Sequence, residues 1–394
     1  MGDPWLSIIG LGEDGLAGLT DASRAALKAA EIVFGGPRHL ALLGADGRGR
    51  EWPVPFSVAQ VLAVKGSRVA VLASGDPFWF GAGGSLAALL GPDEWRAYPV
   101  PSTFSLAAAR LGWRLEDVLC LGLHAAPLTR LRPLLGRGVR AICLVRDAAA
   151  VGELTTWLAK AGFAPSRLWV MEALGGPRER VRQCVAEAFA LTDITAPVAV
   201  AIEAEGQGMP RIAGLPDDLF AHDGQITKRP VRALTLSALA PRPGEVLWDI
   251  GTGSGSVSIE WLLAAPGSRA HALESDAGRA ARAQQNAAAF GLAHRYDMTL
   301  AAAPEGLESL PRPDAVFIGG GASEALLSAL WRLIPMGTRL VANAVTVETE
   351  ALLMRWSGET GGGLLRIELA EAQPLGRKRG WQPARPVVQW SVVR

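Results

Sequence analysis

Short apolar runs alternate with helix-like segments along the first half of the chain. We expect strands at residues 6–10, 32–35, 69–73, 118–121, 141–145, 168–171 and 198–202. Each run is apolar, short and bounded by turn-forming residues, which is typical of strands buried in a sheet. Helices are expected between them, as at residues 21–30, where Thr20 suits the N-cap position. This alternation predicts an α/β fold with largely parallel sheets.

The pattern changes character at residues 205–224, which are rich in Gly, Pro and Asp. We therefore predict a first domain at residues 1–205, a linker at 206–222 and a second α/β domain at 223–394. In the second domain we expect helices at 230–240, 257–263 and 276–290. Strands are expected there at 246–250, 269–273, 298–300, 315–318, 339–342, 365–370 and 387–393.

A glycine-rich loop follows the first expected strand of the second domain. The strand at 246–250 continues into Gly251-Thr-Gly253-Ser-Gly255, and a helix comes next. Glycines let a backbone approach a ligand closely because no Cβ stands in the way. In a doubly wound sheet, a nucleotide-like cofactor sits at the carboxyl end of this strand. The loop is therefore expected to bind such a cofactor.

Two acidic residues indicate which cofactor this is. A dinucleotide fingerprint needs a third glycine where this chain has Ser256, and Asp249 before the loop would repel a pyrophosphate. Asp249 would instead attract the ammonium group of a sulfonium amino acid. Glu274, at the end of the next strand, suits an acceptor for ribose hydroxyls. We therefore predict S-adenosylmethionine here; a nicotinamide cofactor and a tight turn without a ligand are the alternatives.

Other segments of the second domain are expected at the same rim. Ala303 and Pro304 follow a strand where the adenine would be covered, and Gly320 belongs to a glycine cluster after the fourth strand. Asn343 follows the fifth strand, although it is equally explained as a turn residue. Glu260, on the helix after the glycine loop, is a weak candidate for handling a proton, as is Asn343 for catalysis.

The first domain also carries a glycine loop, Gly10-Leu-Gly12-Glu-Asp-Gly15. It matches G-x-G-x-x-G, but the expected helix begins too late for a dinucleotide site, so the motif alone is weak. Two further strand ends give it weight.

Gly75-Asp76-Pro77 ends one strand, and Ser102-Thr103 begins a helix whose free N–H groups could meet a carboxylate. Small or turn-forming residues at three strand ends indicate a cleft. Asp76 is equally explained by an Asp-Pro turn.

Bulk properties narrow the classes of partner. The formal net charge is +1, and no basic, aromatic-rich stretch indicates nucleic-acid binding. The three cysteines lack metal-ligand spacing, so no metal site is predicted. No apolar stretch reaches the ~20 residues that span a bilayer, and no signal peptide is recognised, so we expect a cytoplasmic protein.

Beyond these motifs, both halves resemble known families. Residues 1 to about 205 resemble the tetrapyrrole (uroporphyrinogen and corrin) methylases through four segments: 9–16, 75–77, 101–105 and 171–180. Residues from about 223 resemble the decarboxylating corrin methyltransferases with a Rossmann-like fold, through 223–232 and 248–256. The segment Ile226-Thr-Lys-Arg229 and the order of the two halves are specific, whereas glycine loops occur in many methyltransferases.

The resemblance implies two methyl transfers to meso carbons of a corrin precursor and loss of carbon dioxide from a ring acetate, in cobalamin biosynthesis. Each domain would bind one S-adenosylmethionine. The cofactor residues would be Gly10, Gly12, Gly75, Asp76, Pro77, Ser102, Thr103, Asp249, Gly251, Gly253, Gly255, Glu274, Ala303 and Pro304. The substrate residues would be Thr227, Lys228, Arg232, Gly320 and Asn343.

The substrate is rimmed by carboxylates, which basic side chains could bind. Lys228, Arg229 and Arg232 form one such cluster and residues 377–379 form another, although both are equally explained as solvated surface. Relatives form homo-oligomers, so assembly is expected. The alternatives are a methyltransferase acting on a nucleic acid base or another small molecule, a nicotinamide oxidoreductase, and a scaffold that binds cofactor without chemistry.

Overall fold

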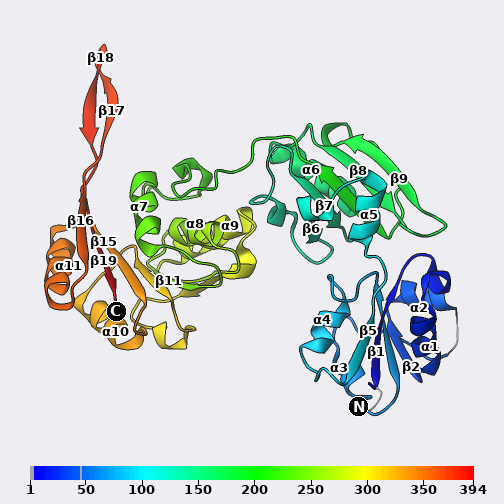
Figure 1. Ribbon diagram of the computed structural model, residues 1–394. Coiled ribbons are helices and arrows are strands. Elements are labelled where there is room, and N and C mark those ends of the chain that lie inside the picture. Colours follow the sequence, from blue (N-terminus) through cyan, green and yellow to red (C-terminus); the bar gives the residue numbers. More distant parts are fainter. Residues whose placement is uncertain (1–3, 45–46) are drawn as a thin grey trace. The chain divides into compact units, whose positions relative to one another are not determined.

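The computed structural model describes residues 4–44 and 47–394 of the 394-residue chain (Figure 1). The chain forms two compact units. Unit 1 comprises Met1–Leu128 and Leu135–Gln207, and unit 2 comprises Thr129–Leu134 and Gly208–Arg394. Both are built of α and β elements, so the predicted α/β class is confirmed.

The first sheet of unit 1 is parallel, with the strand order β3-β2-β4-β1-β5. Its strands are β1 (Leu6–Leu11), β2 (Ile32–Gly35), β3 (Gly49–Glu51), β4 (Val69–Ser74) and β5 (Trp95–Tyr98). Its helices are α1 (Asp21–Ala29), α2 (Pro37–Leu43), α3 (Ala59–Leu62), α4 (Ala82–Ala87) and α5 (Thr103–Leu111). Thr20 caps α1 as predicted, because its hydroxyl accepts a hydrogen bond from the backbone N–H of Ser23.

The second sheet of unit 1 is mostly antiparallel, which corrects the expectation of largely parallel sheets. Its order is β6-β7-β10-β8-β9, and only β6 and β7 run parallel. The strands are β6 (Val118–Gly122), β7 (Arg140–Leu144), β8 (Arg167–Glu172), β9 (Arg180–Val185) and β10 (Val198–Glu203), with helix α6 at Ala148–Lys160. A buried apolar run gives no strand direction. The short β8–β9 connection returns the chain antiparallel, since a parallel crossover needs a dozen or more residues.

Unit 2 contains a seven-stranded sheet with the order β13-β12-β11-β14-β15-β19-β16. The strands are β11 (Val246–Ile250), β12 (Arg269–Glu274), β13 (Tyr296–Leu300), β14 (Ala315–Ile318), β15 (Arg339–Ala344), β16 (Gly363–Ile367) and β19 (Val387–Val393). Strands β11 to β15 are parallel, and the order reverses between β11 and β14. Such a switch point opens a crevice at the carboxyl ends of the strands.

Helices cover both faces of this sheet. They are α7 (Arg229–Leu239), α8 (Ser256–Ala264), α9 (Ala277–Ala289), α10 (Glu324–Leu333) and α11 (Val347–Thr360). The apolar residues of α7, α8 and α9 form one core cluster, and those of α10 and α11 form another. The sheet is therefore buried on both sides, as the apolar strand runs predicted.

A hairpin follows β16 and was not predicted. It consists of β17 (Ala370–Leu375) and β18 (Lys378–Pro383), and it projects beyond the main sheet (Figure 1). The strand expected near 365–370 corresponds to β16, but its bounds are shifted, since β16 ends at Ile367 and residue 370 begins β17. Trp381 on the hairpin is 76% exposed. Buried strands give an apolar sequence signal, whereas an exposed two-stranded ribbon does not.

The segment expected to link the domains at 206–222 is largely packed into unit 2. Leu215 and Phe220 are buried in its core, and the Phe220 ring stacks on Phe290. Ala221 exchanges two backbone hydrogen bonds with the side-chain amide of Asn286. The Gly- and Pro-rich composition therefore marks irregular structure here and not a free connector.

In the part of the chain that the structure describes, no helix is long and apolar enough to cross a membrane.

Candidate active sites

The strand-end loops of unit 1 pack tightly against one another. A Cβ on Gly10 would lie 1.9 Å from the carbonyl oxygen of Gly75, and one on Gly75 would lie 2.7 Å from the Cα of Ser102. The Asp76 carboxylate accepts a hydrogen bond from the Phe78 N–H, and the Ser102 hydroxyl accepts one from the Ser105 N–H as the N-cap of α5. Packing and turn formation thus explain these residues without a ligand.

A cavity of about 340 Å³ lies where these loops face the second sheet of unit 1. Its wall includes the ends of β1, β4, β7 and β8, and the beginning of β10. Gly12, Gly75 and Thr103 line it, among the residues predicted to bind cofactor. Gly10, Asp76 and Pro77 are not among its lining residues. A cavity of this size at converging strand ends is typical of a small-molecule site.

A second cavity of about 280 Å³ adjoins the first. Its wall is rich in aromatic side chains: Trp52, Phe56, Trp79, Phe80 and Phe104. Flat apolar rings suit a flat conjugated ligand. Four residues line both cavities: Ser74, Thr103, His124 and Leu144. The predicted residues Ser102 and Thr103 belong to this second wall.

Sequence reasoning missed Ser74, His39 and His124. Ser74 and His124 line both cavities, and His39 lines the second. The available signal was Pro37-Arg-His-Leu40, which places a charged residue and a histidine directly after a buried strand. A strand end is where functional side chains gather in α/β folds.

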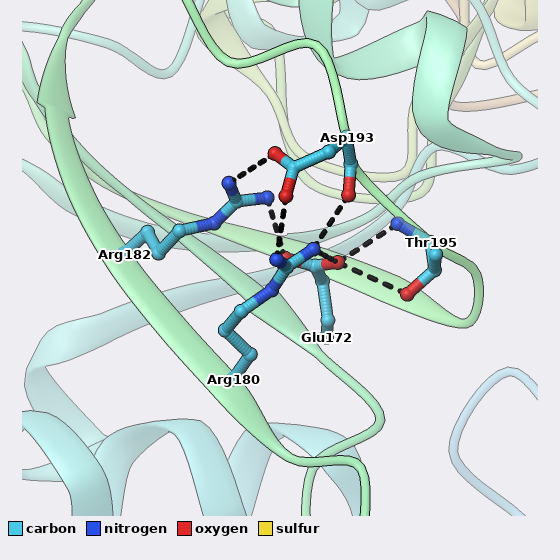
Figure 2. Close-up of polar contacts among 5 residues, drawn as sticks. All are labelled: Glu172, Arg180, Arg182, Asp193 and Thr195. Atoms are coloured by element: carbon cyan, nitrogen blue, oxygen red, sulfur yellow. Dashed lines mark hydrogen bonds and ion pairs between the residues drawn. The ribbon is translucent and has the colours of Figure 1, made fainter.

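A buried ionic network lies at the end of β8 (Figure 2). It directly follows Met171, which lines the first cavity. Glu172 is fully buried and accepts hydrogen bonds from Arg180, Arg182 and Thr195. Asp193 binds the same two arginines. Burial alone would raise the pKa of Glu172, but the bonds from Arg180, Thr195 and Arg182 outweigh it and hold that pKa at about 2.

In unit 2 the glycine loop joins strand β11 to helix α8, as its sequence predicted. Gly251, Gly253 and Gly255 all have positive φ, at 67°, 59° and 75°, which disfavours any side chain. A Cβ on Gly253 would meet no atom within 4 Å, so open space lies over the middle of the loop. Glu274 fixes the loop, since its carboxylate accepts a hydrogen bond of 2.9 Å from the Gly253 N–H.

Asp249 lies buried beneath this loop. One carboxylate oxygen, Oδ2, accepts hydrogen bonds from the hydroxyls of Thr252 at 2.6 Å and Ser258 at 2.5 Å. The other oxygen, Oδ1, is buried and has no partner among the described residues. Burial raises the pKa of Asp249 to about 6, because no cation compensates the charge. An unsatisfied buried carboxylate oxygen of this kind fits a cationic ligand.

Binding of S-adenosylmethionine to unit 2 should therefore weaken as pH falls through 6. A cationic ammonium favours the ionised Asp249, so affinity is expected to fall by about tenfold per pH unit below the pKa. Calorimetric titration of the full chain between pH 5 and 8 measures this. Asp249→Asn keeps the shape without the charge, so the site of unit 2 should bind weakly at every pH. A site whose affinity is unchanged in this variant would contradict the assignment.

The remaining rim residues of unit 2 are exposed or half-buried. Gly320 has no atom within 4 Å of a built Cβ, whereas its neighbour Gly319 packs against the carbonyl oxygen of Gly251 at 2.9 Å. Pro304 is exposed and Ala303 is half-buried, on the loop after β13. Lys228 is exposed at the N-cap of α7, and Thr227 precedes it. The basic run 377–379 lies at the turn of the β17–β18 hairpin.

Arg232 and Glu260 form a buried ion pair, which corrects their expected roles. Arg232 is 0% exposed and donates to Glu260 at 2.6 Å and to Asp217 at 2.9 Å. Its other bonds go to the backbone carbonyls of Thr227 and Leu215. Glu260 also accepts from the N–H groups of Gly214 and Leu215. Arg232 therefore faces no substrate, and Glu260 is fixed in structural bonds.

Asn343 is likewise bound inside the fold. Its amide donates to the Thr235 hydroxyl at 3.0 Å and accepts from the Gln389 amide at 3.0 Å. Gln389 also donates to Thr235. This network joins α7, β15 and β19, so Asn343 serves the packing of the sheet edge, and the catalytic and substrate roles expected for it are corrected.

Comparison with known proteins matches a family model to most of each unit. A family model described as "Tetrapyrrole (Corrin/Porphyrin) Methylases" matches residues 6–190, and one described as "Precorrin methyltransferase domain" matches residues 218–394. The chain is 48% identical to the precorrin-6Y C(5,15)-methyltransferase (decarboxylating) of Sinorhizobium sp over 397 residues. The match covers 98% of this chain and 96% of the relative. The chain belongs to this family. It is therefore a decarboxylating methyltransferase that uses S-adenosylmethionine. The motifs of the second domain predicted the cofactor, and the family resemblance implied the decarboxylation.

Of two further relatives, one matches nearly the whole chain and the other matches less than half of it. The enzyme of the same name from Mycobacterium tuberculosis (strain CDC 1551 / Oshkosh) is 41% identical, over 98% of this chain and 99% of its own. A protein of Pyrobaculum calidifontis, named probable cobalt-precorrin-6B C(15)-methyltransferase (decarboxylating), is 38% identical over 171 residues. That match covers 42% of this chain and 87% of the archaeal protein.

Proposed function

We propose that this enzyme methylates precorrin-6Y at the meso carbons C5 and C15 and removes carbon dioxide from the C12 acetate, which gives precorrin-8x in cobalamin biosynthesis. The observation that carries the proposal is the union in one chain of two methyltransferase modules, matched along 98% of its length by an enzyme named for this double reaction. A methyltransferase for another small molecule or a nucleic acid base would not need both modules.

The two activities divide between the domains. The domain at 223–394 methylates C15 and decarboxylates, and the domain at 1–205 methylates C5, with 206–222 between them. Support comes from the archaeal relative, a protein of about one domain's length whose name joins C15 methylation with decarboxylation. The aromatic cavity of unit 1 then accommodates the macrocycle for the C5 transfer.

Each domain holds one S-adenosylmethionine, which supplies a methyl group on a sulfonium centre. In unit 1 the 340 Å³ cavity, with Gly12, Gly75 and Thr103 in its wall, has the size and position for it. In unit 2 the unpartnered Oδ1 of Asp249 and the open space over Gly253 support a cationic ligand at the loop.

The protein's contribution is mainly alignment. Methyl transfer is an in-line displacement, so the rate depends on holding the nucleophilic carbon against the methyl group. In unit 1 the adjoining cavities, with four residues in common, bring donor and acceptor together. The electrons that decarboxylation releases enter the conjugated macrocycle. Among the described residues, no group of three or more His, Cys, Asp or Glu side chains could hold a metal ion.

The assembly is a cytoplasmic homo-oligomer that takes a small-molecule tetrapyrrole and no nucleic acid. An exposed two-stranded hairpin is marginally stable alone in water. The β17–β18 ribbon, with Trp381 and Leu375 exposed, therefore supports contact with another copy of the chain.

The test is mass spectrometry of the purified chain incubated with S-adenosylmethionine and precorrin-6Y. The expected product has gained two methyl groups and lost one carbon dioxide. A gain of one methyl group alone would leave one domain without an activity. An unchanged corrin, with cofactor binding confirmed by calorimetry, would exclude this substrate.

A further inference from the structure

Three polar side chains meet at the wall between the two cavities of unit 1. Arg38 and His39 belong to α2, and Ser74 is the last residue of β4. Arg38 Nη2 donates to Ser74 Oγ at 2.6 Å and to His39 Nε2 at 2.9 Å. Ser74 Oγ lies 2.9 Å from His39 Nε2. The three groups therefore form a closed triangle of hydrogen bonds.

The arginine determines where the imidazole carries its proton. A guanidinium can only donate, so His39 Nε2 must accept, and we assign the proton of the neutral ring to Nδ1, which is buried without a hydrogen-bond partner among the described residues. Burial, and then the charge of Arg38, lowers the pKa of His39 to about 4. The ring is therefore neutral at pH 7. Its single Nε2 lone pair is shared between the Arg38 N–H and the Ser74 hydroxyl, each of whose heavy atoms lies 2.9 Å away.

Ser74 occupies the junction between donor and acceptor. It lines both cavities, whereas His39 lines only the aromatic one. The other charged or titratable groups near the triangle are Glu13, which binds Arg38, Arg178, which lies 3.6 Å from Glu13, and His124 in the shared wall. Thr103 and His124 also line both cavities, but the Ser74 hydroxyl is the one that lies within hydrogen-bonding distance of both Arg38 and His39.

The reaction proposed above must release a proton at that carbon. The new C–C bond forms as the S–CH₃ bond breaks, and the meso carbon then carries both a hydrogen and a methyl group on a cationic macrocycle. Loss of this proton returns the C–H electron pair to the ring system and restores its conjugation. Because the cation is acidic, a weak base is sufficient, provided that it is correctly placed.

We propose that Ser74 accepts this proton while its own hydroxyl proton passes to His39 Nε2. The inference rests on the proposed function of unit 1. Ser74 is the catalytic residue, and Arg38 is a positioning residue that orients both partners. The imidazolium formed beside Arg38 does not retain its proton at neutral pH, so it returns the proton through Ser74 to water after the product leaves.

The test uses the full chain, S-adenosylmethionine and precorrin-6Y deuterated at C5. Ser74→Ala and His39→Gln should lower kcat for C5 methylation by about 10²-fold, the lower range for general acid–base catalysis. They should also raise the primary isotope effect above that of the wild type, with KM unchanged. Ser74→Thr keeps the hydroxyl and should restore both values. Ser85→Ala, on the exposed face of α4, is the matched control and should leave both unchanged.

Each other outcome has a definite meaning. If the wild type transfers no methyl group, the proposed function fails. If the wild type transfers methyl groups and the variants keep its kcat and isotope effect, the relay is wrong while the function stands. A higher KM at unchanged kcat would assign the triangle to binding a substrate carboxylate and would also overturn the relay. Cofactor affinity measured by calorimetry confirms that each variant is folded. If Ser74→Ala does not fold, His39→Gln tests the relay in its place.

Discussion

Replacing Glu172 by alanine is expected to lower the free energy of unfolding of unit 1 by about 3 kcal/mol. The carboxylate is fully buried and is shared by Arg180, Arg182 and Thr195 (Figure 2). Its removal leaves two adjacent arginines with Asp193 as their remaining carboxylate partner. Breaking a buried pair costs about 3–5 kcal/mol, and the lower value applies because both guanidiniums keep some solvent contact.

The same carboxylate makes unit 1 sensitive to acid. The pKa of Glu172 is about 2 in the folded chain and about 4.3 in an unfolded one, so its stabilisation is complete above the unfolded value. It is lost as pH falls from about 4.5 toward 2. Hydrogen exchange of peptides from β8 and β9 in the full chain reports on unit 1 alone. Glu172→Gln should flatten this pH dependence.

Glu116→Gln is the matched control, since its exposed pair with Arg114 should contribute nothing measurable. Exchange in β8 and β9 that is equally slow in Glu172→Ala and the wild type would show that the network does not stabilise the unit.

Local motifs were predictable because their residues are neighbours along the chain. The strand, loop and helix at 246–264 follow from an apolar run, alternating glycines and a helical segment, and the structure has them in this form. Thr20 was recognised as an N-cap for the same reason. Glu274 was predicted to end the next strand and to accept bonds from ribose hydroxyls. The structure has it at that strand end, where it accepts a hydrogen bond from the Gly253 N–H, and its ribose role stays a prediction.

Features assembled from distant segments were not predictable. The aromatic wall of the second cavity joins side chains from residues 52 to 104, each of which alone suits an ordinary core. The Arg38–His39–Ser74 triangle needs the ends of β2 and β4 to be adjacent, which strand order alone reveals. Two polar residues were assigned to substrate binding from the sequence, but their hydrogen-bond partners lie inside the fold. Arg232 binds Glu260, and Asn343 binds Thr235.

Replacing Glu260 by alanine is expected to cost about 3–5 kcal/mol of the stability of unit 2 and to leave its chemistry unaltered in the molecules that stay folded. The carboxylate is 3% exposed and neutralises Arg232, which is 0% exposed. Without it, the buried guanidinium keeps Asp217 as its carboxylate partner, and the N–H groups of Gly214 and Leu215 lose their acceptor.

A structural Glu260 and a proton-handling Glu260 predict different results. If the role is structural, chemical denaturation shows an earlier transition for unit 2, and C15 methylation per folded molecule keeps the pH profile of the wild type. Glu260→Gln keeps the volume and one acceptor oxygen, so it should lose less stability than Glu260→Ala. Glu359→Ala, on the exposed face of α11, should change neither quantity. An altered pH profile at unchanged stability would instead show that Glu260 handles a proton in the reaction. A carboxylate that only binds Arg232 and the segment at Gly214 exchanges no proton with the substrate.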